Sequence, residues 1–220
     1  RYRLYRNDWD AMVWEGWDEL PALPFGSFDD FQLETGADVD GVLERVHVYR
    51  AALVSVPAMA DATVSEAAPA ANFAADPALD VSRGPAGSEQ RAYLRFEVPP
   101  QQHPISASRL VLRSETFEGV LKAYATGAGW TESTIAWASA PPPGAILDSD
   151  GPLAPGETAR IDSSAHIRNP GPHAIALRAG RDDAGTGLAS RDAPFGGPVL
   201  ELLMEAPLAA GTGEAWLLLE

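Results

Sequence analysis

The sequence predicts an all-β protein, an antiparallel and jelly-roll-like β-sandwich with an aromatic-rich β extension before it and one extra strand after it. From residue 58 onward, segments of four to nine residues rich in β-branched and aromatic side chains recur at short intervals. Loops rich in Pro, Gly and Asp separate them, and no stretch shows the 3.6-residue apolar period of an amphipathic helix. This combination is typical of antiparallel sandwiches and barrels.

Residues 1–57 differ in composition from the rest, because nine of the 18 aromatic side chains lie within the first 50 residues. Residues 1–6 alternate polar and apolar side chains, Asn7 and Asp8 are turn-forming, and residues 9–17 resume an extended pattern. This pattern predicts a hairpin, and residues 27–33 and 46–50 are predicted as two more strands. We expect this segment to be a β extension or the end of a preceding domain.

Residues 58–206 are predicted to form the sandwich itself. The alanine-rich stretch 65–75 is predicted as a loop, because Pro69 interrupts any helix there. The predicted strands are residues 61–66, 78–82, 91–98, 106–114, 119–125, 133–138, 159–162, 173–179 and 198–205.

Residues 207–220 are predicted to be a hinge followed by a strand. The flexible Gly211-Thr212-Gly213 precedes the apolar run Trp216, Leu217, Leu218 and Leu219. An exposed apolar strand tends to pair with another strand. It either completes the chain's own sheet beside the N-terminal hairpin or adds to a neighbouring subunit, in which case it is an assembly strand.

Composition excludes several classes of function. A net charge of −15 and a pI near 4.5 are the opposite of the basic surface that nucleic acid requires. The absence of Cys excludes disulfides and thiol catalysis, and the absence of 18 consecutive apolar residues predicts no membrane insertion. None of the common catalytic motifs is present, so we expect that the protein is not an enzyme.

Two short motifs resemble the start of a calcium loop. Asp38 and Asp40 precede Gly41, and Asp148 and Asp150 precede Gly151. Neither motif continues with the glutamate that an EF-hand places at its twelfth position. A looser structural Ca²⁺ and plain turn chemistry both fit these residues, and no other cofactor is expected.

An ordered series of motifs runs from about residue 58 to 205. It includes Ala60-Asp61-Ala62, the strand around Tyr93-Leu94-Arg95, Trp130-Thr131-Glu132 and Ser190-Arg191-Asp192. Together they resemble the DNRLRE-type domain, also called the disaggregatase-related carbohydrate-binding module. The resemblance implies a secreted β-sandwich attached to polysaccharide-acting enzymes or to large surface proteins.

Strand alternation suggests a binding surface for such a module. Tyr93 and Arg95 share one strand face, where an aromatic ring can stack on a sugar and a guanidinium can grip an anion. Alternatively, Arg95 pairs with Glu97 or Asp192 to lock neighbouring strands.

A second set of residues is expected to extend this surface. If the strands 106–114 and 119–125 are neighbours, Arg109, Arg113, Lys122 and Tyr124 form one basic strip. Trp130 and Trp137 are expected to anchor the core rather than to face a ligand.

Two functions follow from these observations. The first is a non-catalytic carbohydrate-binding module, extracellular or on the cell surface, that grips a polysaccharide and favours an acidic one. The alternative is a structural subunit of an extracellular filament, sheath or surface layer, whose partners are copies of itself joined by strand addition through the termini.

Overall fold

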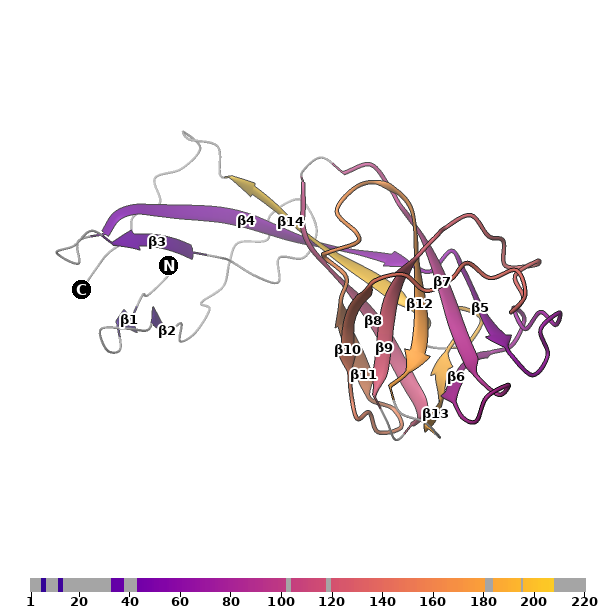
Figure 1. The fold of residues 1–220 in the computed structure, drawn as a ribbon. Helices are drawn as coiled ribbons and strands as arrows, with labels where there is room; N and C mark the ends of the chain where they lie inside the picture. Colours follow the sequence, from indigo (N-terminus) through magenta and orange to yellow (C-terminus); the bar gives the residue numbers. More distant parts are fainter. Residues whose placement is uncertain are drawn as a thin grey trace. The chain divides into compact units, whose positions relative to one another are not determined.

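The computed structural model describes residues 5–6, 12–13, 33–37, 43–101, 104–117, 120–180, 184–194 and 196–207 of the 220-residue chain (Figure 1). The chain divides into two compact units, one of Arg1–Ala52 with Pro207–Glu220 and one of Leu53–Ala206. The described residues form strands and turns and no helix, so none of them forms a helix able to cross a membrane. The predicted all-β class is therefore confirmed.

The first unit contains two small antiparallel pairings. β1 (Tyr5–Arg6) pairs with β2 (Met12–Val13), and β3 (Leu33–Ala37) pairs with the first part of β4 (Leu43–Pro57), whose last five residues belong to the second unit. The expected C-terminal strand, Trp216 to Leu219, lies outside the described residues, and its pairing stays a prediction.

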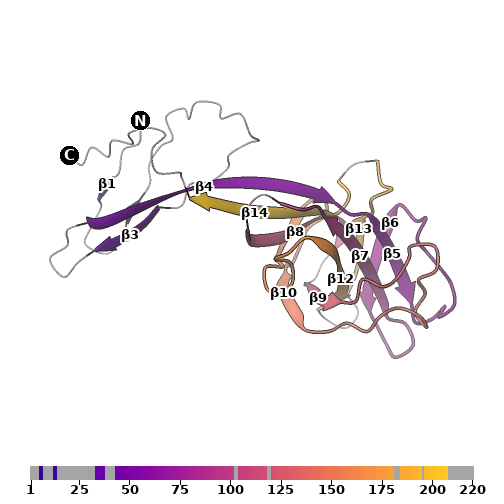
Figure 2. The ribbon, with the colours of Figure 1, turned by 90° about the horizontal axis from the view of Figure 1, so that it is seen from above.

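The second unit is a two-layered antiparallel sandwich (Figure 2). The first layer has the order β10-β9-β12-β7-β5, and the second layer consists of β6, β13, β8, β14 and β11. β6 and β7 share only the pair Ser82↔Gln90, where the two layers join. The strands are β5 (Ala60–Ser65), β6 (Ala78–Arg83), β7 (Gln90–Val98), β8 (Ile105–Phe117), β9 (Leu121–Thr126), β10 (Ile146–Asp150), β11 (Thr158–Asp162), β12 (Gly171–Ala179), β13 (Ala184–Ala189) and β14 (Val199–Pro207).

Apolar side chains fill the space between the layers, as period-two alternation requires. Leu94 and Phe96 of β7 are fully buried, whereas Glu97 between Phe96 and Val98 is exposed. The second layer contributes Leu110 and Leu112 of β8, both at most 1% exposed. The alternation in β7 therefore separates an inner face, which carries Leu94 and Phe96, from an outer face, which carries Tyr93 and Arg95.

The outer face of the first layer carries a smaller apolar cluster. β5 is buried on both faces, because Ala62 and Val64 lie under the chain that follows β9. The cluster consists of Ala60, Ala62, Val64, Ala74, Tyr93, Trp130, Ile135 and Ala176, with Tyr124, Trp137 and Ala140 packed against it.

The predicted strand at residues 133–138 is wrong, since this segment forms turns over that cluster. The Ile135 N–H donates to the Thr131 carbonyl at 3.0 Å, and the Ala140 N–H to the Ala136 carbonyl at 2.7 Å. The Asn72 amide donates to the carbonyls of Glu132 and Ile135, which fixes the turns against residues 66–75. The predicted loop at residues 65–75 is confirmed.

Two strands of the sandwich were missed because their sequences lack strand signals. β13 reads Ala-Gly-Thr-Gly-Leu-Ala, and glycine has a low strand propensity, yet it pairs along its length with β6. β10 contains two aspartates and pairs with β9. In both cases a neighbouring strand supplies the order that the local residues do not.

The inner face provides a direct test of the sandwich. Replacing the fully buried Phe96 with Ala should lower the free energy of unfolding by about 3–5 kcal/mol, because it removes a large apolar side chain and leaves a cavity. Urea denaturation followed by circular dichroism measures this loss. The adjacent exposed Glu97→Ala serves as control and should change the free energy of unfolding by about 0.5 kcal/mol or less. Equal effects of the two substitutions would contradict this placement of the core.

Candidate functional site

Two cationic side chains, Arg178 and Lys122, lie directly opposite each other on the neighbouring strands β12 and β9, on the outer face of the first layer. The β12–β9 register pairs Arg178 with Lys122 and Ala176 with Tyr124. Residues directly opposite in an antiparallel pair share a sheet face, so Arg178, Lys122 and Tyr124 lie together. Tyr124 packs against the edge of the outer apolar cluster, and the Arg178 guanidinium lies 5.8 Å from the centroid of its ring.

Like charges directly opposite each other destabilise a sheet unless other charges offset them. Within the described residues, the Lys122 side chain makes no hydrogen bond or ion pair, and the Arg178 guanidinium is hydrogen-bonded only through Nε. The terminal nitrogens of Arg178 and the Lys122 ammonium are therefore unused donors on neighbouring strands. Two cationic donors arranged side by side in this way can bind an anion.

A single carboxylate organises the neighbouring arginines. Glu89 accepts hydrogen bonds from Nε and Nη2 of Arg91, both at 2.9 Å, and from Nε of Arg178 at 2.6 Å. Burial alone would raise the pKa of Glu89, but the hydrogen bonds from Arg91 and Arg178 lower it to about 2. The Arg91 guanidinium also lies 4.2 Å above the centroid of the Trp137 ring, in a cation–π contact.

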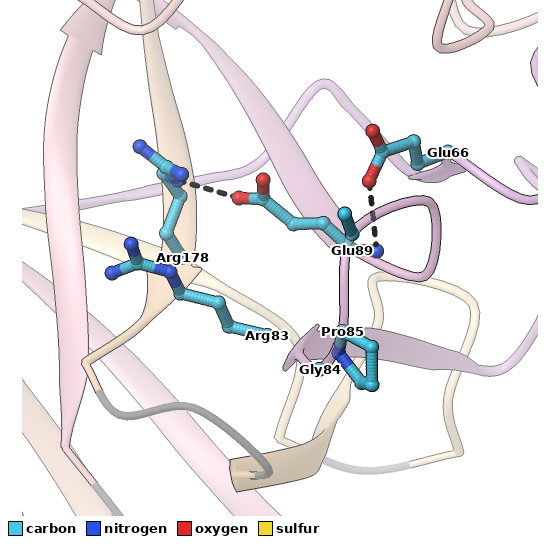
Figure 3. Close-up of a pocket in the computed structure, with 7 residues that line it drawn as sticks. Glu66, Arg83, Gly84, Pro85, Glu89 and Arg178 are labelled. Carbon is cyan, nitrogen blue, oxygen red and sulfur yellow. Dashed lines mark hydrogen bonds and ion pairs between the residues drawn. The ribbon is translucent and has the colours of Figure 1, made fainter.

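An open pocket adjoins these residues. It has a volume of about 580 Å³ and is lined by Glu66, Arg83, Gly84, Pro85, Ala86, Glu89 and Arg178. Figure 3 shows Arg178 and Arg83 on one side, Glu66 across from them, and Glu89 reaching toward Arg178 from its side of the pocket. Glu66 accepts the N–H groups of Gly87 and Glu89, and Gly87 has a positive φ of 89°, which favours glycine. The turn between β6 and β7 thus forms a fixed wall.

Comparison with known protein families assigns the module to a family. Residues 52–202, about two thirds of the chain, match the family described as Carbohydrate-binding module family 96. The chain belongs to carbohydrate-binding module family 96. A carbohydrate-binding module, which the sequence resemblance implied, is thereby confirmed, whereas the finer DNRLRE-type assignment stays a prediction. No curated protein matches the chain.

Two of the predicted binding residues, Tyr93 and Arg95, use their side chains for contacts within the module. Tyr93 is 1% exposed, its hydroxyl donates to the Pro141 carbonyl at 2.8 Å, and its ring meets Trp130 edge to face. Because the ring is buried, it offers no face for a sugar. Arg95 donates to the Trp130 carbonyl, rather than pairing with Glu97 or Asp192 as one alternative expected.

The predicted four-residue strip does not form, because its two strands are not neighbours. β9 pairs with β10 and β12, whereas β8 pairs with β11, β13 and β14. Arg109 and Arg113 therefore lie on the second layer, where Arg109 pairs with Glu201. Lys122 and Tyr124 do share a face, but their cationic neighbour is Arg178, which sequence reasoning missed. Its only signal was its place in the same predicted strand as His173 and Ala179.

The prediction for Trp130 is confirmed, since it is 6% exposed within the outer cluster. Trp137 is half-buried against the same cluster. It was expected to anchor the core, and it packs against the cluster while its ring also contacts the Arg91 guanidinium.

The calcium candidates Asp148 and Asp150 bind backbone groups of the other layer. Asp148 accepts the Asp162 N–H at 3.0 Å, and Asp150 accepts the Arg160 N–H at 2.7 Å. These carboxylates of β10 thus satisfy alternate amides of β11. Asp38 and Asp40 lie outside the described residues, so a calcium ion there stays a prediction.

Three of the sequence motifs meet at one place in the module. Ligand oxygens of Asp61, Glu132 and Asp192 lie within 4.8 Å of one another, a spacing that suits a cation. The Arg191 guanidinium already lies 3.1 Å from Glu132, and the Arg191 N–H donates to Asp61 at 2.7 Å. Burial, together with the nearby carboxylates, raises the pKa of Asp61 to about 6, although the Arg191 N–H opposes the shift.

The raised pKa of Asp61 gives a prediction about stability and pH. Because the folded-state pKa lies above 3.8, this group stabilises the fold fully below pH 3.8, and that contribution is lost as the pH rises through about 6. Replacing Asp61 with Asn should remove this dependence. The free energy of unfolding of the variant relative to wild type should rise between pH 4 and pH 7.5, by up to about 3 kcal/mol.

Urea denaturation at a series of pH values measures this difference. The exposed Ser133→Ala removes no titratable group and should give a difference that is constant over the same range. A constant difference for Asp61→Asn as well would contradict the assigned burial effect.

Proposed function

We propose that this module is a non-catalytic, extracellular carbohydrate-binding protein that holds an acidic polysaccharide on the outer face of its first layer. Membership of carbohydrate-binding module family 96 supports the carbohydrate ligand. The observation that carries the acidic ligand is the cross-strand pair Arg178 and Lys122, whose terminal donors are unused within the described residues. Polymers of uronic acids are found outside the plasma membrane, which is where we place the module.

The chemistry of the pair suits a sugar acid. A guanidinium edge binds a carboxylate through two parallel hydrogen bonds, and an adjacent ammonium adds a point charge. Tyr124 is half-buried two residues from Lys122 on the same face, so its ring edge can contact the apolar side of a sugar. On a protein of net charge −15, the acidic surface elsewhere repels an anionic polymer, so the polymer is directed to this cationic pair.

Substitution of the cation pair tests this function. Arg178→Ala and Lys122→Ala should each weaken binding to polygalacturonate by about tenfold, since each removes a charge-assisted contact of about 1.4 kcal/mol. Binding is measured by affinity electrophoresis and by isothermal titration calorimetry. It should weaken with added salt, because salt screens exposed charges.

Two controls make the result specific. Fully methyl-esterified polygalacturonate has the same backbone without charge and should bind much more weakly to wild type. Arg113→Ala removes the same charge from the second layer and should leave affinity unchanged. If wild type binds neither polymer, or if Arg113→Ala weakens binding as much as Arg178→Ala, the proposed site is wrong.

A further inference from the structure

Glu89 accepts different hydrogen bonds from the two neighbouring arginines, Arg91 and Arg178. Its carboxylate uses both Nε and Nη2 of Arg91, which is the fork that would otherwise bind a carboxylate ligand. From Arg178 it takes only Nε, at 2.6 Å (Figure 3). Arg91 is therefore engaged within the protein, whereas the two terminal nitrogens of Arg178 stay available beside Lys122.

The surroundings of Glu89 hold it in place. Its own backbone N–H donates to Glu66 at 3.3 Å, and its carbonyl accepts the Glu66 N–H at 2.9 Å. Its side chain is 14% exposed, and Arg91 is pressed against Trp137 at 4.2 Å. Because both the backbone of Glu89 and its carboxylate are held by hydrogen bonds, the carboxylate can act as a rigid anchor for the long, flexible side chain of Arg178.

We infer that Glu89 is a positioning residue, which orients the Arg178 guanidinium so that its terminal nitrogens meet the anionic group of the ligand. The inference rests on the proposed function and adds to it the residue that prepares the site. Because the arginine is ordered before the ligand binds, the free energy of binding does not include the entropic cost of ordering this side chain. A negative charge in a site for anions is otherwise a disadvantage, because it repels the ligand.

This contrast gives opposite expectations for substitution. If Glu89 acts only as a charge, Glu89→Gln should tighten binding of polygalacturonate. If it positions Arg178, binding should weaken despite the lost negative charge, and we expect a loss of about fivefold. Glu89→Asp keeps the charge but shortens the side chain by one methylene, so that it no longer reaches Arg178, and should weaken binding by a similar factor.

Matched controls separate positioning from general loosening of the turn. Glu66→Asp makes the same deletion in the same pocket at a residue that contacts backbone amides rather than arginine, and should change affinity much less. In the Arg178→Ala background, Glu89→Asp should have no further effect, because the residue it positions is gone. Circular dichroism confirms that each variant is folded, and Glu89→Asp provides the test if Glu89→Gln does not fold.

A spectroscopic signature tests the anchor without any ligand. The Arg178 Nε–H resonance in a ¹⁵N–¹H spectrum, assigned by its loss in Arg178→Ala, should be protected from exchange in wild type and should broaden in Glu89→Asp. Failure of wild type to bind polygalacturonate overturns the proposed function and this inference together. Binding by wild type with equal or tighter binding by both Glu89 variants overturns this inference alone, as does an unchanged Arg178 resonance.

Discussion

The burial of Tyr93 on the outer face of the first layer decides how the rest of that face is used. An aromatic ring at this position must be covered, and its hydroxyl needs a partner, which the Pro141 carbonyl supplies. The segments 66–75 and 127–141 therefore fold over the middle of the face and form the outer cluster with Trp130 and Ile135. What they leave uncovered is the end of the face where Arg178 and Lys122 lie. This core requirement therefore leaves the partly exposed Arg178 and Lys122 at the end of the face where we propose that the ligand binds.

The sequence predicts where the strands of this fold lie along the chain better than it predicts which strands pair. Alternation located the inner face of β7 and placed Lys122 and Tyr124 together, because both depend only on the period of one strand. The pairing of β9 with β12 rather than with β8 depends on a connection that spans the intervening loops and strands, and no local residue pattern specifies it. For the same reason Arg178 was not recognised as part of a site, and β13 was not recognised as a strand. The three motifs around Asp61, Glu132 and Asp192 could be listed from the sequence, but their meeting is a property of the closed sandwich alone.

Two carboxylates of this module illustrate how surroundings decide the response of a charge to pH. Asp61 is buried beside Glu132 and Asp192, so its ionised form is unfavourable and its pKa rises. Glu89 is also shielded, but Arg91 and Arg178 donate to it and lower its pKa. The stabilisation from Glu89 is therefore present above pH 4.5 and is lost as the pH falls toward 2, while that from Asp61 changes in the opposite sense. The arginines stay anchored over the whole range in which uronic acids are ionised.

In the described part of the sandwich, one edge is protected against pairing with a further strand. β11 lies at the border of the second layer, and its outward amides at residues 160 and 162 would be free to pair with another chain. Asp150 and Asp148 of β10 occupy these two amides, and their spacing of two residues matches the two-residue repeat of the strand edge. The D-x-D pattern that resembles a calcium loop in the sequence thus serves, in the fold, to join the two layers. Because those donors are used internally, this edge is closed to strand addition at these positions.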